Sequence, residues 1–332
     1  MKFGILLPTR EVVLSSRSDP ASIYDLADRT EALGFHSVWV GDSVVAKPRL
    51  DALTTLAAVS ARTKRIRLGT AVYLAALRNP VLVAHMVATV DWLSRGRLDL
   101  GIGYARPNDP VQEKEYRVLG HDPAKRIKMS EELVQVMRKL WRENDVSFAG
   151  AFSNFENITV EPKPSQPCGV PIWLASNNIE PGLKRVARLG DGWLNNITDP
   201  KVYAECLAKI RAYAAAARRN PDEIEPGLYF TLAAGGRDAI EEGQKFLSQY
   251  YNRPHEAVAR TMVCVMGSWE QVLDRIQAYC AAGARTVVLR FAGSDQIAYL
   301  ESCAEQLGRR GFLSRQVSGI ESTASSPMIR GS

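Results

Sequence analysis

The sequence predicts an α/β fold of parallel strands, a (β/α)8 barrel, because short apolar segments and amphipathic segments alternate along most of its 332 residues. The stretch 65–104 has the clearest pattern: a short strand, a helix that begins at Pro80 and ends before Gly96, and a second strand. This connection is long enough to join two parallel strands. A doubly wound open sheet is the alternative. It usually has a glycine-rich first turn, and residues 8–10 contain no glycine.

Eight strands are expected, each a short run of residues typical of a buried strand. They are 2–7, 37–41, 66–72, 98–103, 171–175, 192–195, 227–233 and 286–291. Helices between them are indicated by apolar residues at helical spacing, at 23–33, 52–62, 80–93, 181–189 and 203–217. Two or three extra helices are expected over 238–282, before the eighth strand, and one helix after it.

An inserted segment, at about 105–170, interrupts the alternation after the fourth strand. Residues 105–122 are polar and contain Pro107 and Pro110, so we expect them to be irregular. A helix around 133–141 follows, and 146–160 has the β-branched and aromatic residues of a hairpin. We therefore predict one barrel domain, 1–311. Residues 312–332 are rich in Ser and Gly without periodicity, which predicts a disordered tail.

The helix 80–93 is apolar on nearly every side. Such a helix should be buried all round, between its own sheet and a second surface. An exposed apolar patch of that size would be unusual on a monomer. We therefore expect a homodimer formed through this helix and the helix 52–62.

Composition excludes several classes of protein. No window is apolar and long enough for a transmembrane helix, and residues 1–20 lack a signal peptide, which predicts a cytoplasmic protein with no membrane partner. The net charge of +6 is spread among acidic residues, so we expect no nucleic-acid partner, although a phosphorylated ligand would be favoured. The five cysteines and four histidines have no zinc-site spacing, and no metal site is expected.

In a barrel the active site lies at the C-terminal ends of the strands, which makes the residues just after each strand the candidates. Ser176, Asn177 and Asn178 precede a helix, whose free N–H groups and dipole suit a phosphate, although an N-cap for that helix is the simpler alternative. Arg10 and Arg49 are candidates for an anionic substrate or cofactor phosphate, with surface solvation as the alternative.

The stretch 65–104 resembles the bacterial luciferase-like monooxygenases and their deazaflavin-dependent relatives. The residues that carry the resemblance are Leu68-Gly69-Thr70, Asn79-Pro80, Asp91, Leu93-Ser94, Gly96-Arg97 and Leu100-Gly101-Ile102-Gly103. It extends over roughly 1–307 and favours the barrel over the open sheet. It implies that Ala175, Ser176, Asn177 and Asn178 form the loop that holds the cofactor phosphate. It also implies that Gly103 and Tyr104 lie beside the flavin ring, with a non-prolyl cis peptide, Ala71–Val72, behind it.

Two departures from the family pattern bear on the chemistry. Many relatives have an acidic residue followed by His where this chain has Asp42-Ser43. A hydroxyl can donate a hydrogen bond to a flavin but is a poor base near neutral pH. Asp42 and Ser43 are therefore the predicted catalytic pair, with capping of a turn as the alternative for Ser43. The glutamate that follows the Gly-x-Gly in deazaflavin sugar-phosphate dehydrogenases is also missing, since Tyr104 stands there, which argues against that activity.

The resemblance implies a flavin-dependent oxidoreductase. Our first expectation is a monooxygenase that uses reduced FMN and oxygen on a small organic substrate, with a separate flavin reductase as partner. A hydride-transferring oxidoreductase that uses the deazaflavin coenzyme F420 is the alternative within enzymes. A non-catalytic flavin-binding protein is the alternative outside them, because the family's His is replaced by Ser43.

Overall fold

The computed structural model describes residues 1–15, 19–106 and 108–313, and their strands form a closed parallel barrel. Strand β1 pairs with β2 on one side and with β11 on the other, and β8 pairs with β9. The barrel prediction is therefore confirmed. The barrel strands in spatial order are β1 (Lys2–Leu6), β2 (Ser37–Val40), β3 (Arg67–Thr70), β4 (Leu98–Ile102), β7 (Ile172–Ala175), β8 (Gly192–Leu194), β9 (Glu225–Ala234) and β11 (Thr286–Phe291).

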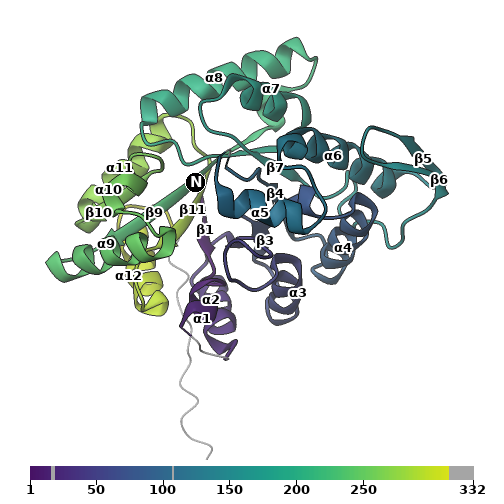
Figure 1. Cartoon of the computed structure of the whole chain (residues 1–332). Coiled ribbons are helices and arrows are strands. Elements are labelled where there is room, and N and C mark those ends of the chain that lie inside the picture. The colour runs from purple at the N-terminus through teal and green to yellow at the C-terminus, as the bar shows by residue number, and fades with distance from the viewer. Residues whose placement is uncertain (16–18, 107, 314–332) are drawn as a thin grey trace, which may run out of the picture.

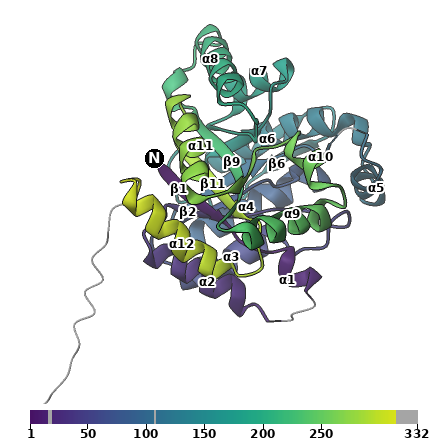
Figure 2. The same ribbon diagram turned by 90° about the vertical axis from the view of Figure 1, so that its left-hand side faces the viewer.

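Helices surround the strands, as Figure 1 and Figure 2 show. Several begin where the sequence supplies a capping side chain: Asp51 accepts a hydrogen bond from the Thr54 N–H, and Asn79 from the Val81 N–H just after Pro80. The helices that cover the barrel are α2 (Ala21–Ala32), α3 (Ala52–Arg62), α4 (Pro80–Leu93), α7 (Glu180–Leu189), α8 (Pro200–Ala216), α11 (Trp269–Ala281) and α12 (Gln296–Arg309). The last and first of these, α12 and α2, pack side by side (Figure 2).

Two tryptophans fill the barrel interior beneath its C-terminal mouth. Trp39 on β2 and Trp173 on β7 are nearly fully buried, with ring centroids 5.5 Å apart in an edge-to-face arrangement. Gly69 and Gly192 make room for them, because a Cβ at either position would overlap an indole ring. The interior is thus packed, and a cavity opens at each end of the barrel.

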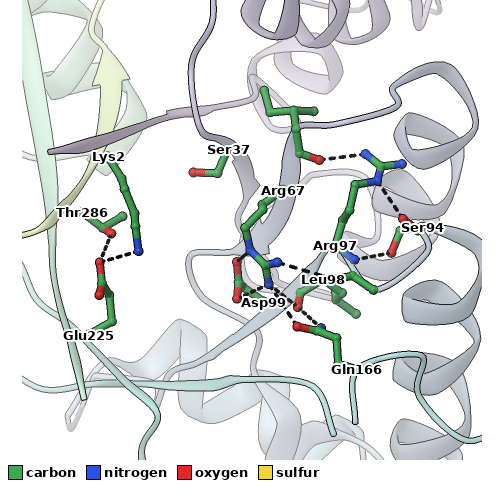
Figure 3. A network of polar contacts seen from close by, with 12 residues as sticks. Lys2, Ser37, Arg67, Ser94, Arg97, Leu98, Asp99, Gln166, Glu225 and Thr286 are labelled. Atoms are coloured by element: carbon green, nitrogen blue, oxygen red, sulfur yellow. Dashed lines mark hydrogen bonds and ion pairs between the residues drawn. The ribbon is translucent and has the colours of Figure 1, made fainter. Parts of the chain in front are cut away.

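The N-terminal end of the barrel carries a network of polar contacts (Figure 3). The Arg67 guanidinium makes two 2.7 Å hydrogen bonds to the Asp99 carboxylate, and Gln166 donates to the Leu98 carbonyl oxygen. On the neighbouring strands, Glu225 accepts from the Thr286 hydroxyl at 2.8 Å. These residues tie together the starts of the strands, an end of the barrel that serves stability.

The insertion lies between β4 and β7, where the sequence places it. It contains α5 (Pro110–Val118), α6 (Arg126–Arg142) and the antiparallel hairpin β5 (Val146–Ala149) and β6 (Asn154–Ile158), which projects beside α4 and α6 in Figure 1. The hairpin prediction is confirmed. The expectation that 105–122 is irregular is wrong, because Asp109 caps α5 and Pro110 occupies its first turn, where a proline starts a helix.

A ninth strand of the same sheet, β10 (Cys264–Gly267), lies where the sequence predicted only helices. The other elements before β11 are helical as expected: α9 (Arg237–Tyr251), α10 (His255–Ala259) and α11. Strand β9 pairs with β8 only at Glu225 and Pro226, so its later residues have an open edge, and β10 pairs there with 231–234. A four-residue strand on such an edge has too short a pattern to be distinguished from a helix.

Helix α4 is not buried all round in the single chain. Leu82 is 61% exposed and Trp92 59%, and Met86 lies between them on the same face. The homodimer therefore stays a prediction, and this apolar face is its natural location. Among the described residues, no helix is both long and apolar enough to cross a membrane.

The predicted disordered tail is described only in part. Phe312 packs edge to face on Phe3, with ring centroids 5.6 Å apart, and Leu313 also contacts the core, so the chain is ordered beyond 311. Residues 314–332 lie outside the described residues.

Candidate active site

A cavity of about 610 Å³ opens at the C-terminal mouth of the barrel. Most of the site residues predicted from the sequence line it: Asp42, Ser43, Arg49, Ala71, Val72, Gly103, Tyr104, Ala175, Ser176 and Asn177. Two others lie outside its lining. Asn178 is exposed next to Asn177, and Arg10 lies over the Tyr250 ring, with its guanidinium carbon 4.4 Å from the ring centroid.

One wall of the cavity is backbone at the ends of β3 and β4. The Ala71–Val72 peptide bond is cis, as the family resemblance implies. Gly103 faces Val72 across the two strands, and a Cβ at Gly103 would overlap the Val72 side chain. The adjacent Tyr104 ring lies 4.9 Å from the Arg185 guanidinium carbon, and burial raises the pKa of its phenol to about 12. The Tyr104 phenol therefore stays neutral at physiological pH.

Asp42 has its carboxylate fully engaged by protein groups. Arg78 donates to both carboxylate oxygens, at 2.7 and 2.9 Å, and the Leu74 N–H donates at 2.9 Å. This bidentate pair holds the loop after β3 against the end of β2. The predicted catalytic role of Asp42 is not tested by these contacts.

Ser43 belongs to a network built around Glu115 of α5. The Ser43 hydroxyl donates to Glu115 Oε1 at 2.8 Å, and the backbone N–H groups of 44–46 donate to the same oxygen at 2.5 to 3.1 Å. The Ser43 oxygen in turn accepts from the Lys47 N–H at 2.9 Å. Glu115 Oε2 is buried without a partner in the described part of the chain. These contacts fix the loop from Ser43 to Lys47 at the cavity wall.

The loop between β7 and α7 has free backbone donors. Neither the Asn177 N–H nor the Asn178 N–H has an acceptor among the described residues. The Asn177 side chain is held in place, since its Nδ2 donates to Asn196 Oδ1 at 2.7 Å and its Oδ1 accepts from the Asn196 N–H. Ser176 Oγ packs against Gly182, where a Cβ would overlap it. The loop is thus preformed, with two N–H groups available to an anion.

A third wall carries cations. Lys47 and Arg49 follow β2, and Arg106 follows β4. Burial, followed by repulsion from Arg106, Arg49 and Arg10, lowers the pKa of Lys47 to about 8, with Asp109 opposing the shift. Lys47 therefore changes charge close to physiological pH, unlike an ordinary lysine.

The sequence reasoning missed four residues of this site: Glu115, Lys47, Arg106 and Tyr250. Lys47 and Arg106 could have been found, because each follows a predicted strand as Arg49 does. Glu115 was missed because its segment was predicted to be irregular and not helical. Tyr250 lies at the end of α9, and no sequence pattern indicates that this helix end reaches the mouth. Within 1–15, 19–106 and 108–313, no group of three or more His, Cys, Asp or Glu residues could hold a metal ion.

Comparison with protein families gives one match to most of the chain. The model of the luciferase-like monooxygenase family matches residues 1–286. A curated relative from Kineococcus radiotolerans, an F420-dependent glucose-6-phosphate dehydrogenase, is 28% identical over 313 residues, which cover 85% of this chain and 90% of the relative.

Solved structures share the fold. An F420-dependent secondary alcohol dehydrogenase, solved with an F420–acetone adduct, has a TM-score of 0.78 at 21% identity and covers 92% of this chain and 98% of its own. The monooxygenase RslO1 from Streptomyces bottropensis has a TM-score of 0.76 at 24% identity and covers 94% and 100%. At these identities the likeness extends to the barrel and not to the chemistry.

Proposed function

Because this chain belongs to the luciferase-like monooxygenase family and is an oxidoreductase, we propose that it uses coenzyme F420 to transfer a hydride to or from a small organic substrate. The full-length curated relative is F420-dependent, and so is one of the solved structures. Our first expectation, oxygenation by reduced FMN with a separate reductase, has less support. It becomes the competing outcome of the test below.

The residues present fit a deazaflavin at the mouth. The cavity has the volume of a cofactor site. As the family resemblance implies, the Ala71–Val72 backbone would lie behind the ring, with Gly103 and Tyr104 beside it; all four residues line the cavity. The unpaired N–H groups of Asn177 and Asn178 would hold the phosphate, together with the start of α7.

When bound, F420 supplies a two-electron hydride donor or acceptor. The remaining requirement is a proton, since reduction of a carbonyl needs an acid and oxidation of an alcohol needs a base. The single observation that carries the proposal is Lys47, a cavity-lining amine whose pKa is lowered to about 8 by burial and by the neighbouring cations. A group with a pKa near the working pH is the most effective acid–base catalyst. Lys47 Nζ would give its proton to the oxygen of a carbonyl substrate, or accept it from an alcohol.

Ser43 and Glu115 then act as positioning residues. Ser43 Oγ accepts from the backbone N–H of Lys47, and Glu115 holds both Ser43 and the N–H groups of 44–46. The four-donor network fixes the loop that carries Lys47. This role modifies the catalytic role predicted for Ser43, and it leaves Asp42 as the residue that anchors the neighbouring loop through Arg78.

We do not extend the glucose-6-phosphate specificity of the relative to this chain. The family's glutamate after the Gly-x-Gly is replaced by Tyr104, whose phenol is buried beside Arg185. The family's histidine is replaced by Ser43. An amine, Lys47, and the guanidinium groups of Arg49 and Arg106 line this cavity.

A cofactor titration tests the proposal. The protein is titrated under anaerobic conditions with F420 and with FMN, each oxidised and reduced, and binding is followed by cofactor fluorescence and absorbance. We expect F420 to bind at least tenfold more tightly and reduced F420 to be oxidised only when a carbonyl substrate is added. Preferential binding of reduced FMN, with oxygen consumed and an oxygenated product formed, would favour the monooxygenase. Cofactor binding without turnover of any substrate in a carbonyl and alcohol panel would favour a non-catalytic binding protein.

A further inference from the structure

Three cations that follow β2 and β4 line one part of the cavity. Lys47, Arg49 and Arg106 form no ion pair with any of the described residues. Arg185, which lines the same cavity, does pair with a carboxylate, that of Glu131. Unpaired cations that share one concave wall raise its potential and attract an anion.

Arg49 is held in place with a donor left over. Its Nη2 donates to the Tyr250 hydroxyl at 3.1 Å, and its Nη1 lies so close to Gly41 that a Cβ there would overlap it. Its Nε is buried without a hydrogen-bond partner within the described ranges. A buried guanidinium N–H without an acceptor costs free energy, so the arrangement is explained if a ligand supplies the acceptor.

The nearby carboxylates are engaged elsewhere. Asp42 pairs with Arg78, and Asp109 accepts from the first N–H groups of α5. Glu115 accepts from the backbone of 44–46. Burial is the main cause of the lowered pKa of Lys47, and the positive charges of Arg106, Arg49 and Arg10 lower it further, whereas Asp109 raises it. Lys47 Nζ lies 5.7 Å from the centroid of the Tyr251 ring, and the Arg106 guanidinium carbon lies 6.0 Å from the same centroid.

Lys47 and Arg49 lie apart from the loop expected to hold the cofactor phosphate. They follow β2, whereas the loop with the N–H groups of Asn177 and Asn178 follows β7, and strands β3 and β4 lie between the two in the barrel order. Arg106 follows β4, which pairs with β7, so it lies nearer to the phosphate loop. The mouth therefore offers a place for an anion on the β2 side in addition to the loop after β7.

We propose that Arg49 and Arg106 form an oxyanion-binding subsite beside Lys47, so that the substrate is a small carbonyl compound or alcohol that carries a carboxylate or a phosphate monoester. The proposal deepens the hydride-transfer function and rests on it for the identity of the reacting group. Arg49 binds the oxyanion through its Nε and Nη groups, Arg106 closes the subsite from the β4 side, and the substrate oxygen that gains or loses a proton faces Lys47.

The amine of Lys47 serves as a built-in reporter of anion binding, which makes the test independent of cofactor and of activity. The cofactor-free protein is labelled with acetic anhydride across pH 6 to 10, and acetylation of Lys47 is quantified by mass spectrometry. Sulfate is the probe, because its charge is constant over this range, and chloride keeps the ionic strength fixed. We expect sulfate to raise the midpoint of Lys47 labelling by about one pH unit, since a nearby opposite charge favours the protonated form. The exposed Lys64 is the internal control and should not change.

Variants show whether sulfate acts from the arginine subsite or from the loop after β7. Arg49→Gln should weaken the sulfate effect by about tenfold or more, as expected for loss of charge-assisted hydrogen bonds. Arg106→Gln, whose guanidinium makes no hydrogen bond within the described chain, is the second variant should Arg49→Gln misfold. Asn177→Asp should leave the effect intact. The subsite is refuted if sulfate does not move Lys47, or if Asn177→Asp abolishes the effect while both arginine variants keep it.

A kinetic arm separates the two sources of the oxyanion. Reduced F420 is oxidised with matched ketones that carry a carboxylate, a phosphate monoester or a neutral methyl ester. We expect one of the two anionic series to have a KM at least tenfold below that of the neutral ester, and Arg49→Gln to remove this difference. Equal KM values for all three would overturn the substrate class. Failure of F420 to bind would overturn the proposed function, and the sulfate titration would still decide the subsite.

Discussion

Replacement of Lys47 tests the proton transfer directly. Lys47→Met keeps an unbranched side chain that reaches as far as Cε and removes the amine that carries the proton. General acid–base catalysis contributes about 10²- to 10⁴-fold to a rate, so turnover should fall by that factor. Cofactor affinity should stay within about twofold, because Lys47 lies on the β2 side of the mouth and the phosphate loop follows β7. The assay is anaerobic oxidation of reduced F420 by a ketone, followed by absorbance.

The pH dependence gives the sign of the effect. Burial and neighbouring cations lower the pKa of Lys47 to about 8. Reduction of a ketone needs the protonated amine, so its rate should fall as pH rises through about 8. Oxidation of the corresponding alcohol needs the neutral amine, so its rate should rise over the same interval. These two changes of rate with pH are the limbs of the pH–rate profiles. Lys47→Met should remove both limbs.

Two neighbours move these limbs in opposite directions. Arg106→Gln removes a repulsive charge and should shift them to higher pH, whereas Asp109→Asn removes an attractive one and should shift them to lower pH. Asn is itself a good N-cap, so α5 should keep its start in the second variant. Lys64→Met is the control on the exposed surface and should change nothing. The reasoning is refuted if the limbs persist in Lys47→Met or if both charge variants move them the same way.

Three further outcomes are expected. Ser43→Ala should lower turnover at least tenfold and cost about 1 kcal/mol of stability, because it loses one donor to Glu115 and the acceptor for the Lys47 N–H. Turnover and thermal unfolding are measured on the same variant. An unchanged rate per folded molecule would mean that Ser43 only caps the turn. Asn177→Asp should weaken cofactor binding tenfold or more by placing a negative charge beside a phosphate, and Asn177→Ala separates this repulsion from the lost contact with Asn196. Leu82→Glu should convert the predicted dimer to a monomer in light scattering, whereas Val118→Glu, at another exposed apolar residue, should not. A wild-type monomer at micromolar concentration would contradict the dimer.

The barrel could be predicted from sequence because each strand and helix is specified locally, by apolar runs, by caps such as Asn79 and by Pro80 at a first turn. The rule that active sites lie at the C-terminal ends of barrel strands then placed most of the predicted site residues at the cavity. The rest could not be predicted, because it depends on contacts between distant segments. Glu115 meets Ser43 across 72 residues, and Tyr250 meets Arg49 across 201. Neither meeting leaves a periodic or spaced signal in the sequence.

The oxyanion subsite and the proton-transferring amine are electrostatically coupled, and the coupling predicts a preferred direction of reaction. An oxyanion at Arg49 and Arg106 offsets the charges that hold the pKa of Lys47 down. Binding of an anionic substrate should therefore raise that pKa and leave Lys47 protonated at neutral pH, ready to act as an acid. The protonated amine assists ketone reduction and cannot accept the proton of an alcohol, so with an anionic substrate bound the reduction should stay fast to a pH above 8.

This coupling can be read from kinetics without knowing the structure of the complex. The pH dependence of kcat/KM reports the free enzyme, and that of kcat reports the enzyme with substrate bound. For an anionic ketone, the limb in kcat should therefore lie at higher pH than the limb in kcat/KM, by about one unit if the bound charge lies within about 6 Å of Nζ. For the neutral methyl ester the two limbs should coincide, since no charge is added beside Lys47. If the anionic and neutral ketones give the same separation, the substrate's charge does not reach Lys47, and the subsite and the acid must act independently.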